Sequence, residues 1–191
     1  MNISRRTLIH FSIFTILGMS AAGLLIIASF HDKSTTEVLF GGKQWYVQIG
    51  IGAVYGLATS IIALMMVGLP MLKETNRFFQ DLIKSINPTF IHILFYSACA
   101  AIGEEILFRG AIQPIIGIWF TSVIFVLLHG YLNPGNLPLS LYGVFLVIVV
   151  AGFGYLYKLV GLGSAVMAHF VYDVIMFSSL KYRKTKDPNP T

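Results

Sequence analysis

The sequence has little charge and almost no cysteine. Only 11% of its 191 residues are Asp, Glu, Lys or Arg, whereas 56% are hydrophobic; soluble domains carry about 25% charged residues. This shortage of charge excludes an ordinary soluble globular domain and predicts an integral membrane protein. The single cysteine, Cys99, excludes an intrachain disulfide and a cysteine metal cluster, and we expect it to be a small buried residue.

Long apolar runs fill most of the chain. A helix needs about 20 apolar residues to cross a bilayer. Six runs approach this length, at residues 8–30, 46–69, 89–110, 112–129, 139–160 and 164–180. We therefore predict an all-α fold, a polytopic membrane bundle of about six transmembrane helices that forms one domain over residues 1–191. The end of the chain, residues 181–191, is basic and then proline-rich, which predicts a disordered tail.

The basic residues are unevenly distributed along the chain. With six spans, nine of the 13 Lys and Arg fall in segments on the side of the N-terminus: Arg5, Arg6, Lys73, Arg77, Lys84, Lys181, Arg183, Lys184 and Lys186. The positive-inside rule then predicts that both termini are cytoplasmic, in the cell membrane, or in the inner membrane if the source is bacterial. The net charge of +5 is thus explained by topology, with the lipid bilayer as a partner and no nucleic acid.

The first run follows a pair of arginines. The segment Ser4-Arg5-Arg6-Thr7-Leu8 resembles a twin-arginine export signal. Its apolar run extends over residues 8–30, well beyond the roughly 7–15 residues that are usual in a cleaved signal. We therefore expect an uncleaved membrane anchor.

Ionisable side chains are rare inside the apolar runs. A charged residue at membrane depth costs roughly 2.5–3.5 kcal/mol on insertion scales, so each one needs a reason. Apart from residues near the run ends, such as His10 and His92, these side chains are Glu104, Glu105, Arg109, His129, His169 and Asp173. They occupy only three of the six runs, which predicts that they converge on one buried polar site.

Helical spacing gives these residues a geometry. Glu105 and Arg109 are four residues apart, so they share a helix face and can pair. Glu104 then points about 100° away without a local cation, which is the setting of a usable general base. His169 and Asp173 also share one helix face. Phe125 and His129 share another, so the ring of Phe125 can form a wall beside the imidazole of His129. Taken singly, each pattern is also compatible with helix pinning or an interfacial histidine.

The three patterns occur in a recognisable order. Glu104-Glu105-x-x-x-Arg109, Phe125-x-x-x-His129 and His169-x-x-x-Asp173 together resemble the three-motif signature of the CPBP family. These are the CAAX-protease and bacteriocin-processing intramembrane proteases, also called Abi or type II CAAX prenyl endopeptidases. The resemblance covers residues 89–178. It implies a helical bundle with a polar cavity open to the cytoplasmic side, and an endopeptidase that cleaves a membrane-associated peptide or protein.

The resemblance also implies roles for the six residues. Glu104 would activate a water molecule with His129, Glu105 and Arg109 would support them, and His169 would help to stabilise the oxyanion. Asp173 stands where the family pattern leads us to expect asparagine. An ionised aspartate cannot donate a hydrogen bond to an oxyanion. Asp173 would then be protonated, orient His169 as a hydrogen-bond acceptor or bind a metal, and of these we favour the orienting role.

Other hypotheses remain open on the same residues. We expect no cofactor, but Glu104, His129 and His169 could instead bind Zn²⁺, as in a metalloprotease, although the chain lacks the His-Glu-x-x-His pattern. A protein of another class, a non-catalytic membrane scaffold or a bacteriocin self-immunity protein, would keep these residues for packing alone. A small transporter with a proton relay would also use buried carboxylates.

Overall fold

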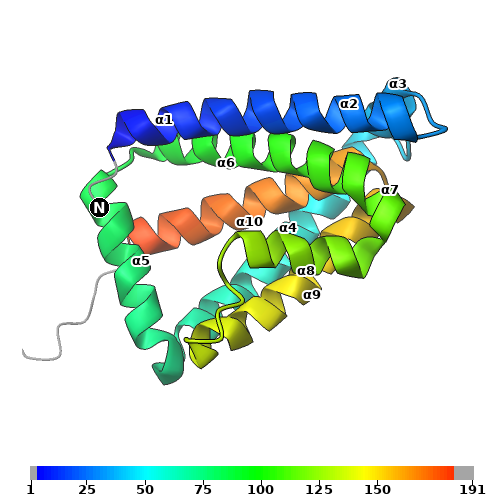
Figure 1. Ribbon diagram of the computed structural model, residues 1–191. Helices are drawn as coiled ribbons and strands as arrows, with labels where there is room; N and C mark the ends of the chain where they lie inside the picture. The colour runs from blue at the N-terminus through cyan, green and yellow to red at the C-terminus, as the bar shows by residue number, and fades with distance from the viewer. Residues whose placement is uncertain (1–3, 183–191) are drawn as a thin grey trace, which may run out of the picture.

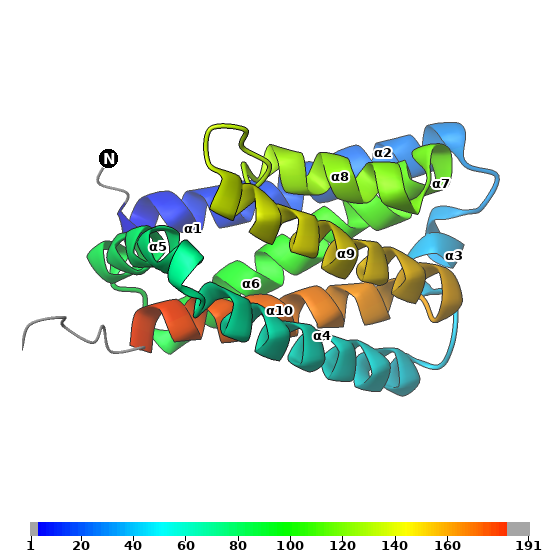
Figure 2. The same ribbon diagram turned by 90° about the horizontal axis from the view of Figure 1, so that it is seen from below.

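The computed structural model describes residues 4–182, and within this range the chain forms only helices and the turns between them. This confirms the predicted all-α class. Part of the predicted disordered tail lies inside the final helix, at residues 181–182, and the rest of it lies outside the described residues. Figures 1 and 2 show the helices as a bundle whose long members run along a common direction.

The first half of the bundle begins with one long helical rod. It contains α1 (Arg5–Phe14), a π-helical stretch and α2 (Ser20–Phe30). A short helix α3 (Thr35–Phe40) and a turn lead into α4 (Trp45–Val67). Then α5 (Lys73–Ile86) crosses one end of the bundle (Figure 1).

The second half carries the predicted polar residues. A long rod contains α6 (Phe90–Glu105), the π-helical segment η3 (Ile106–Ile112) and α7 (Gln113–Ile116). It begins where Thr89 and His92 form a capping box. The chain continues through α8 (Ile118–Leu128) and α9 (Leu137–Leu159) to α10 (Leu162–Tyr182).

Five helices are long and apolar enough to cross a membrane, over Arg5–Phe30, Trp45–Val67, Phe90–Ile116, Leu137–Leu159 and Leu162–Tyr182. The predicted span at 112–129 is therefore wrong. Residues 112–116 continue the third span, and the chain breaks at Gly117, whose φ of 85° is left-handed. The 11-residue helix α8 that follows reaches only about 16 Å, roughly half of the hydrocarbon thickness.

The first and last described helices meet at the same end of the bundle. The Nε of Arg5 donates to the carbonyl of Ile86 at 3.1 Å, and Lys181 donates to the carbonyl of Pro88. Both contacts are made to the junction between α5 and α6, which Figure 1 shows at one end of the molecule. The short helix α8 and the turn after it therefore return the chain towards that end.

Small residues set the closest helix contact. Helices α4 and α10 lie side by side (Figure 2), with Gly52 and Gly56 facing the backbone of Ser164 and Ala168. A Cβ at either glycine would collide with a carbonyl oxygen of α10. This is the small-xxx-small packing of membrane helices. It holds α10 against α4 on one side, so that the opposite side of α10 carries the polar residues of the interior.

Substitution Gly56→Ala tests this contact. The added methyl group meets the carbonyl of Ala168, so we expect a loss of about 1–3 kcal/mol in unfolding free energy, as for overpacked interiors. Thermal unfolding in detergent micelles measures it. Gly50→Ala is the matched control, since a Cβ at Gly50 meets no atom within 4 Å. Equal unfolding temperatures for the two variants would contradict the close packing of α4 on α10.

Candidate active site

The two glutamates and the arginine lie at an irregular point of the third span. Glu104 and Glu105 end α6, and Arg109 lies in the π-helical segment η3 that follows. Such segments are rare and occur frequently at functional sites. Gly103, directly before Glu104, lies so close to the backbone of Thr15 that a side chain there would collide with it. The N-terminal rod therefore packs directly against the point where the charged residues begin.

Glu105 and Arg109 form a buried ion pair, as their spacing predicts. Both are 0% exposed, and Nε of Arg109 lies 3.0 Å from Oε2 of Glu105. Arg109 also donates from Nη2 to the carbonyl of Val150 at 3.3 Å and lies over the ring of Phe125, 4.8 Å from its centroid. The guanidinium is thus compensated by a carboxylate, a carbonyl and an aromatic face, which together offset much of its desolvation cost.

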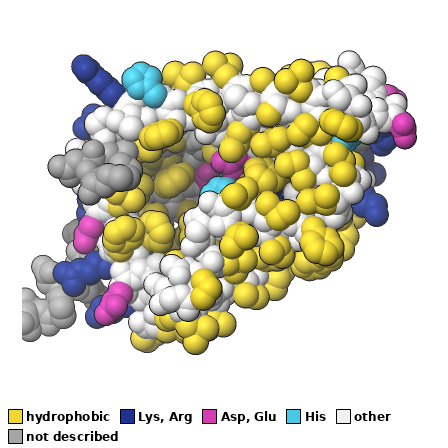
Figure 3. Space-filling model, in the orientation of Figure 1, with side chains coloured by type: hydrophobic (Ala, Val, Ile, Leu, Met, Phe, Trp, Pro, Cys, Tyr) yellow, Lys and Arg dark blue, Asp and Glu magenta, His cyan; other side chains and the backbone are white. Residues whose placement is uncertain are grey.

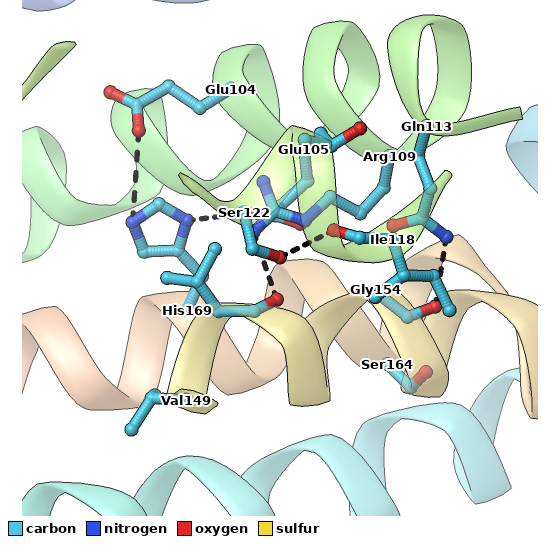
Figure 4. A network of polar contacts seen from close by, with 12 residues as sticks. Glu104, Glu105, Arg109, Gln113, Ile118, Ser122, Val149, Gly154, Ser164 and His169 are labelled. Atoms are coloured by element: carbon cyan, nitrogen blue, oxygen red, sulfur yellow. Dashed lines mark hydrogen bonds and ion pairs between the residues drawn. The ribbon is translucent and has the colours of Figure 1, made fainter. Parts of the chain in front are cut away.

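His169 is held from α10 against this pair. Its Nδ1 lies 2.9 Å from Oε1 of Glu105, and its ring stacks on Phe153 with a centroid distance of 5.6 Å. A carboxylate ionised beside an arginine only accepts hydrogen bonds, so Nδ1 is the donor and Nε2 faces the other carboxylates. Figure 4 shows the ring of His169 between Glu104 and Glu105.

Glu105, rather than Asp173, therefore makes the short hydrogen bond that orients His169. Oδ2 of Asp173 lies 3.5 Å from Nε2 of His169, on the other side of the ring. Spacing along α10 indicates that Asp173 and His169 share a face, and they do. The spacing carries no information on how α10 is rotated against α6. That rotation brings Glu105 to Nδ1 of His169.

His129 is positioned by the end of α8. Its Nδ1 lies 2.7 Å from the carbonyl of Phe125, and its ring stacks on the ring of Phe125 at 4.3 Å, which confirms the expected aromatic wall. Because a carbonyl only accepts, Nδ1 again carries the proton and Nε2 faces the interior. The side chain of His129 is 38% exposed, so its imidazole is more accessible than that of His169.

The carboxylate of Glu104 is where these elements meet. Its Oε2 lies 3.6 Å from Nε2 of His129 and 4.0 Å from Nε2 of His169. Glu104 is only 8% exposed, and this oxygen has no hydrogen-bond partner among the described residues. The structure thus brings together all six residues that the sequence singles out, from α6, η3, α8 and α10.

A cavity of about 420 Å³ opens beside Glu104. Its wall is mainly apolar and is built from α1, α5, α6, α8, α9 and α10. Figure 3 shows a hollow on this face with acidic and histidine side chains at its wall. Glu104, His129, His169 and Asp173 all line the cavity. A larger hollow of about 1010 Å³ lies elsewhere, between the turn before α3 and the start of α8, and contains none of the six residues.

Three tyrosines in the cavity wall escaped the sequence analysis. Tyr142 and Tyr172 are buried with their hydroxyl oxygens 2.9 Å apart, and the ring of Tyr131 packs against Tyr142 at 5.8 Å. The one available signal was that Tyr172 lies three residues after His169, which puts it on the same helix face. Gln113 was also missed; it is buried one turn beyond Arg109 and donates to the carbonyl of Gly154 at 3.0 Å.

The predicted zinc ligands are not arranged as a metal site. In a tetrahedral zinc site with bonds of 2.0–2.1 Å, neighbouring ligand atoms lie about 3.3 Å apart. Oε2 of Glu104 is 3.6 Å and 4.0 Å from the two imidazole nitrogens, which is wider. Within residues 4–182, no three His, Cys, Asp or Glu side chains are placed to hold a metal ion. No catalytic step is therefore derived through a metal.

Comparison with known proteins gives the family. Residues 86–175 match the family model described as type II CAAX prenyl endopeptidase Rce1-like. This segment is an Rce1-like CAAX endopeptidase domain. It runs from the end of α5 into α10 and contains all six polar residues. Its first and last residues each differ by three positions from those of the motif resemblance, which covers residues 89–178. The family is generally one of proteases.

The Rce1-like domain accounts for about half of the chain, but the similarity to one curated protein is longer. The chain is 27% identical over 178 residues to "Uncharacterized protein YpbD" of Bacillus subtilis (strain 168), covering 90% of this chain and 87% of that protein. No solved structure matches the chain.

Substitution Arg109→Leu tests the buried pair. It removes the cation and leaves Glu105 charged in the interior, for which we expect a loss of about 3–5 kcal/mol in unfolding free energy. Thermal unfolding of the purified protein in micelles provides the measurement. Arg77→Leu on exposed α5 is the control and should stay within about 0.5 kcal/mol. An Arg109→Leu protein as stable as this control would show that the pair is not needed for the fold.

Proposed function

We propose that this protein is an intramembrane endopeptidase that hydrolyses a peptide bond in a membrane-associated peptide or protein. The observation that carries the proposal is the carboxylate of Glu104. One of its oxygens is buried without a hydrogen-bond partner, faces two imidazole nitrogens and lies in the wall of a cavity. The match of residues 86–175 to a protease family supports the same reaction class.

The proposed reaction begins with a water molecule between Glu104 and His129. With both Nδ1 atoms protonated, a neutral Nε2 and a carboxylate are two acceptors, which a bridging water can satisfy. Glu104 removes a proton as the water oxygen bonds to the substrate carbonyl carbon, and the carbonyl becomes an oxyanion. The proton then passes to the leaving amine as the C–N bond breaks.

The proposed roles of the other residues follow from their contacts. His169 holds Nδ1 towards Glu105, so as an imidazolium it also donates from Nε2 to the oxyanion. Arg109 holds the carboxylate of Glu105 in place, which in turn fixes the ring of His169. Glu105 and Arg109 thus act as positioning residues behind the cavity wall. Phe125 and Phe153 clamp the two imidazoles by stacking.

Substitution Glu104→Gln tests the reaction. It keeps the shape of the side chain but removes the base, so we expect cleavage to fall by at least about 100-fold with an unchanged unfolding temperature. Comparative peptidomics of membranes from a deletion strain, complemented with wild type or the variant, measures it. Glu74→Gln on exposed α5 serves as the matched control and should behave as wild type.

The same comparison distinguishes the other functions. Identical peptidomes for wild type and Glu104→Gln would contradict the hydrolase and favour a non-catalytic scaffold or immunity protein. Flux driven by a pH gradient in liposomes, without a cleaved product, would favour a transporter. Metal dependence is measured with the identified substrate: we expect full activity after exhaustive chelation, and activity that is lost and restored by Zn²⁺ would replace the metal-free scheme.

We further propose that both termini, and hence the cavity end, face the cytoplasm. Arg5, Lys84 and Lys181 gather near the junction of α5 and α6, and positive residues favour the cytoplasmic side. In a Cys99→Ser background, a cysteine at Ser4 should resist a membrane-impermeant thiol reagent in intact cells. A cysteine at Ser34, in the turn before α3, should react. The reverse labelling pattern would overturn this orientation.

A further inference from the structure

Within residues 4–182, the cavity beside Glu104 is lined by two carboxylates and two histidines, and by no lysine or arginine. Among the described residues that line it, the acidic ones are Glu104 and Asp173, and none is a lysine or an arginine. Arg109 lies behind the wall, completely buried and paired with Glu105. A ligand that enters the cavity therefore meets two carboxylates and no fixed cation.

The cluster keeps an excess of negative charge in the protonation state that the proposed reaction uses, in which His169 is protonated and His129 is neutral. With His169 protonated, as the proposed reaction requires, the cluster has three carboxylates against the two cations Arg109 and His169. One negative charge remains without a partner. Asp173 lies at the edge of this cluster, since its Oδ2 is 3.5 Å from His169 and its side chain is 19% exposed. In a mainly apolar cavity such a charge acts strongly on a ligand, because little water screens it.

Three tyrosines line the same cavity as Asp173. Tyr172 precedes it in α10, Tyr142 is hydrogen-bonded to Tyr172, and Tyr131 packs on Tyr142. Burial raises the pKa of the Tyr131 hydroxyl, and the neighbouring Tyr142 and the negative charge of Asp173 act in the same direction. Tyr131 and Asp173 also line the same cavity. The faces of tyrosine rings attract cations, so the three rings and the carboxylate favour the same sign of ligand.

We propose that Asp173, with Tyr131, Tyr142 and Tyr172, binds a lysine or arginine side chain of the substrate close to the bond that is cleaved. This inference rests on the proposed endopeptidase function and names its substrate class. The apolar stem of such a side chain packs on the tyrosines and the apolar wall, while its charged head reaches the carboxylate. A free carboxyl terminus near the cleaved bond is disfavoured, since Asp173 repels it and no lysine or arginine among the described residues lines the cavity.

The test uses synthetic peptides with one fixed apolar transmembrane segment. A single position is walked through the juxtamembrane residues as lysine, as the neutral isostere norleucine, or as glutamate. Cleavage by the purified full-length protein in proteoliposomes is followed by mass spectrometry. We expect kcat/KM to be at least about 10-fold higher for the best lysine peptide than for its norleucine counterpart, and lowest for glutamate.

The variant Asp173→Asn then tests whether Asp173 causes the preference for lysine over norleucine. It is nearly isosteric and removes one charge, so the ratio of kcat/KM for lysine over norleucine should fall towards one. The ratio is internal to each variant, so a general loss of activity does not affect it. Asp81→Asn on exposed α5 removes the same charge outside the cavity and should keep the wild-type ratio. Equal cleavage of lysine and norleucine peptides by wild type, or an unchanged ratio in Asp173→Asn, would overturn the proposal.

A binding measurement separates this inference from the proposed function. Fluorescently labelled lysine and norleucine peptides are titrated onto the Glu104→Gln protein and onto the Glu104→Gln/Asp173→Asn double variant. We expect tighter binding of the lysine peptide to the first and no discrimination by the second. If wild type cleaves no peptide, the endopeptidase function fails, and this binding ratio still decides whether Asp173 selects a basic side chain.

Discussion

The ion pair between Glu105 and Arg109 is the contact on which the site depends. It lies fully inside the bundle, and it presents the second oxygen of Glu105 to Nδ1 of His169 at 2.9 Å. A buried pair of this kind adds little net stability compared with apolar packing, but losing one partner is costly. Its contribution is therefore one of geometry, because it fixes a ring from α10 against a helix that is far away in the sequence. The other imidazole is fixed separately, by the end of its own helix.

Local spacing was enough to predict much of the site. Four-residue separations gave the Glu105–Arg109 pair and the stacking of Phe125 on His129, since both are contacts within a single helical stretch. The scarcity of charge in the apolar runs gave the convergence of the six residues. Contacts between helices could not be predicted in this way. The preference of His169 for Glu105 over Asp173 depends on how α6 and α10 are rotated against each other.

Two further features were hidden from the sequence for different reasons. The tyrosines of the cavity wall occur in apolar runs, where an aromatic residue is equally compatible with a lipid-facing or an interior position. The span at residues 112–129 was predicted because an apolar run carries no information on backbone conformation. Gly117 adopts a left-handed φ of 85°, which ends the third rod, and the helix that follows is too short to span a membrane by itself.

The short length of α8 determines where His129 lies along the bundle. A full span from Gly117 would carry its last residue to the opposite membrane surface, whereas α8 ends after 11 residues with His129 as its cap. Its rise of about 16 Å is roughly half of the hydrocarbon thickness, and that imidazole lies in the wall of a cavity lined mainly by apolar side chains. A polypeptide can present a scissile amide there only after the local helical hydrogen bonds around that amide have opened. For the proposed endopeptidase, unwinding of the target segment is thus a condition for turnover.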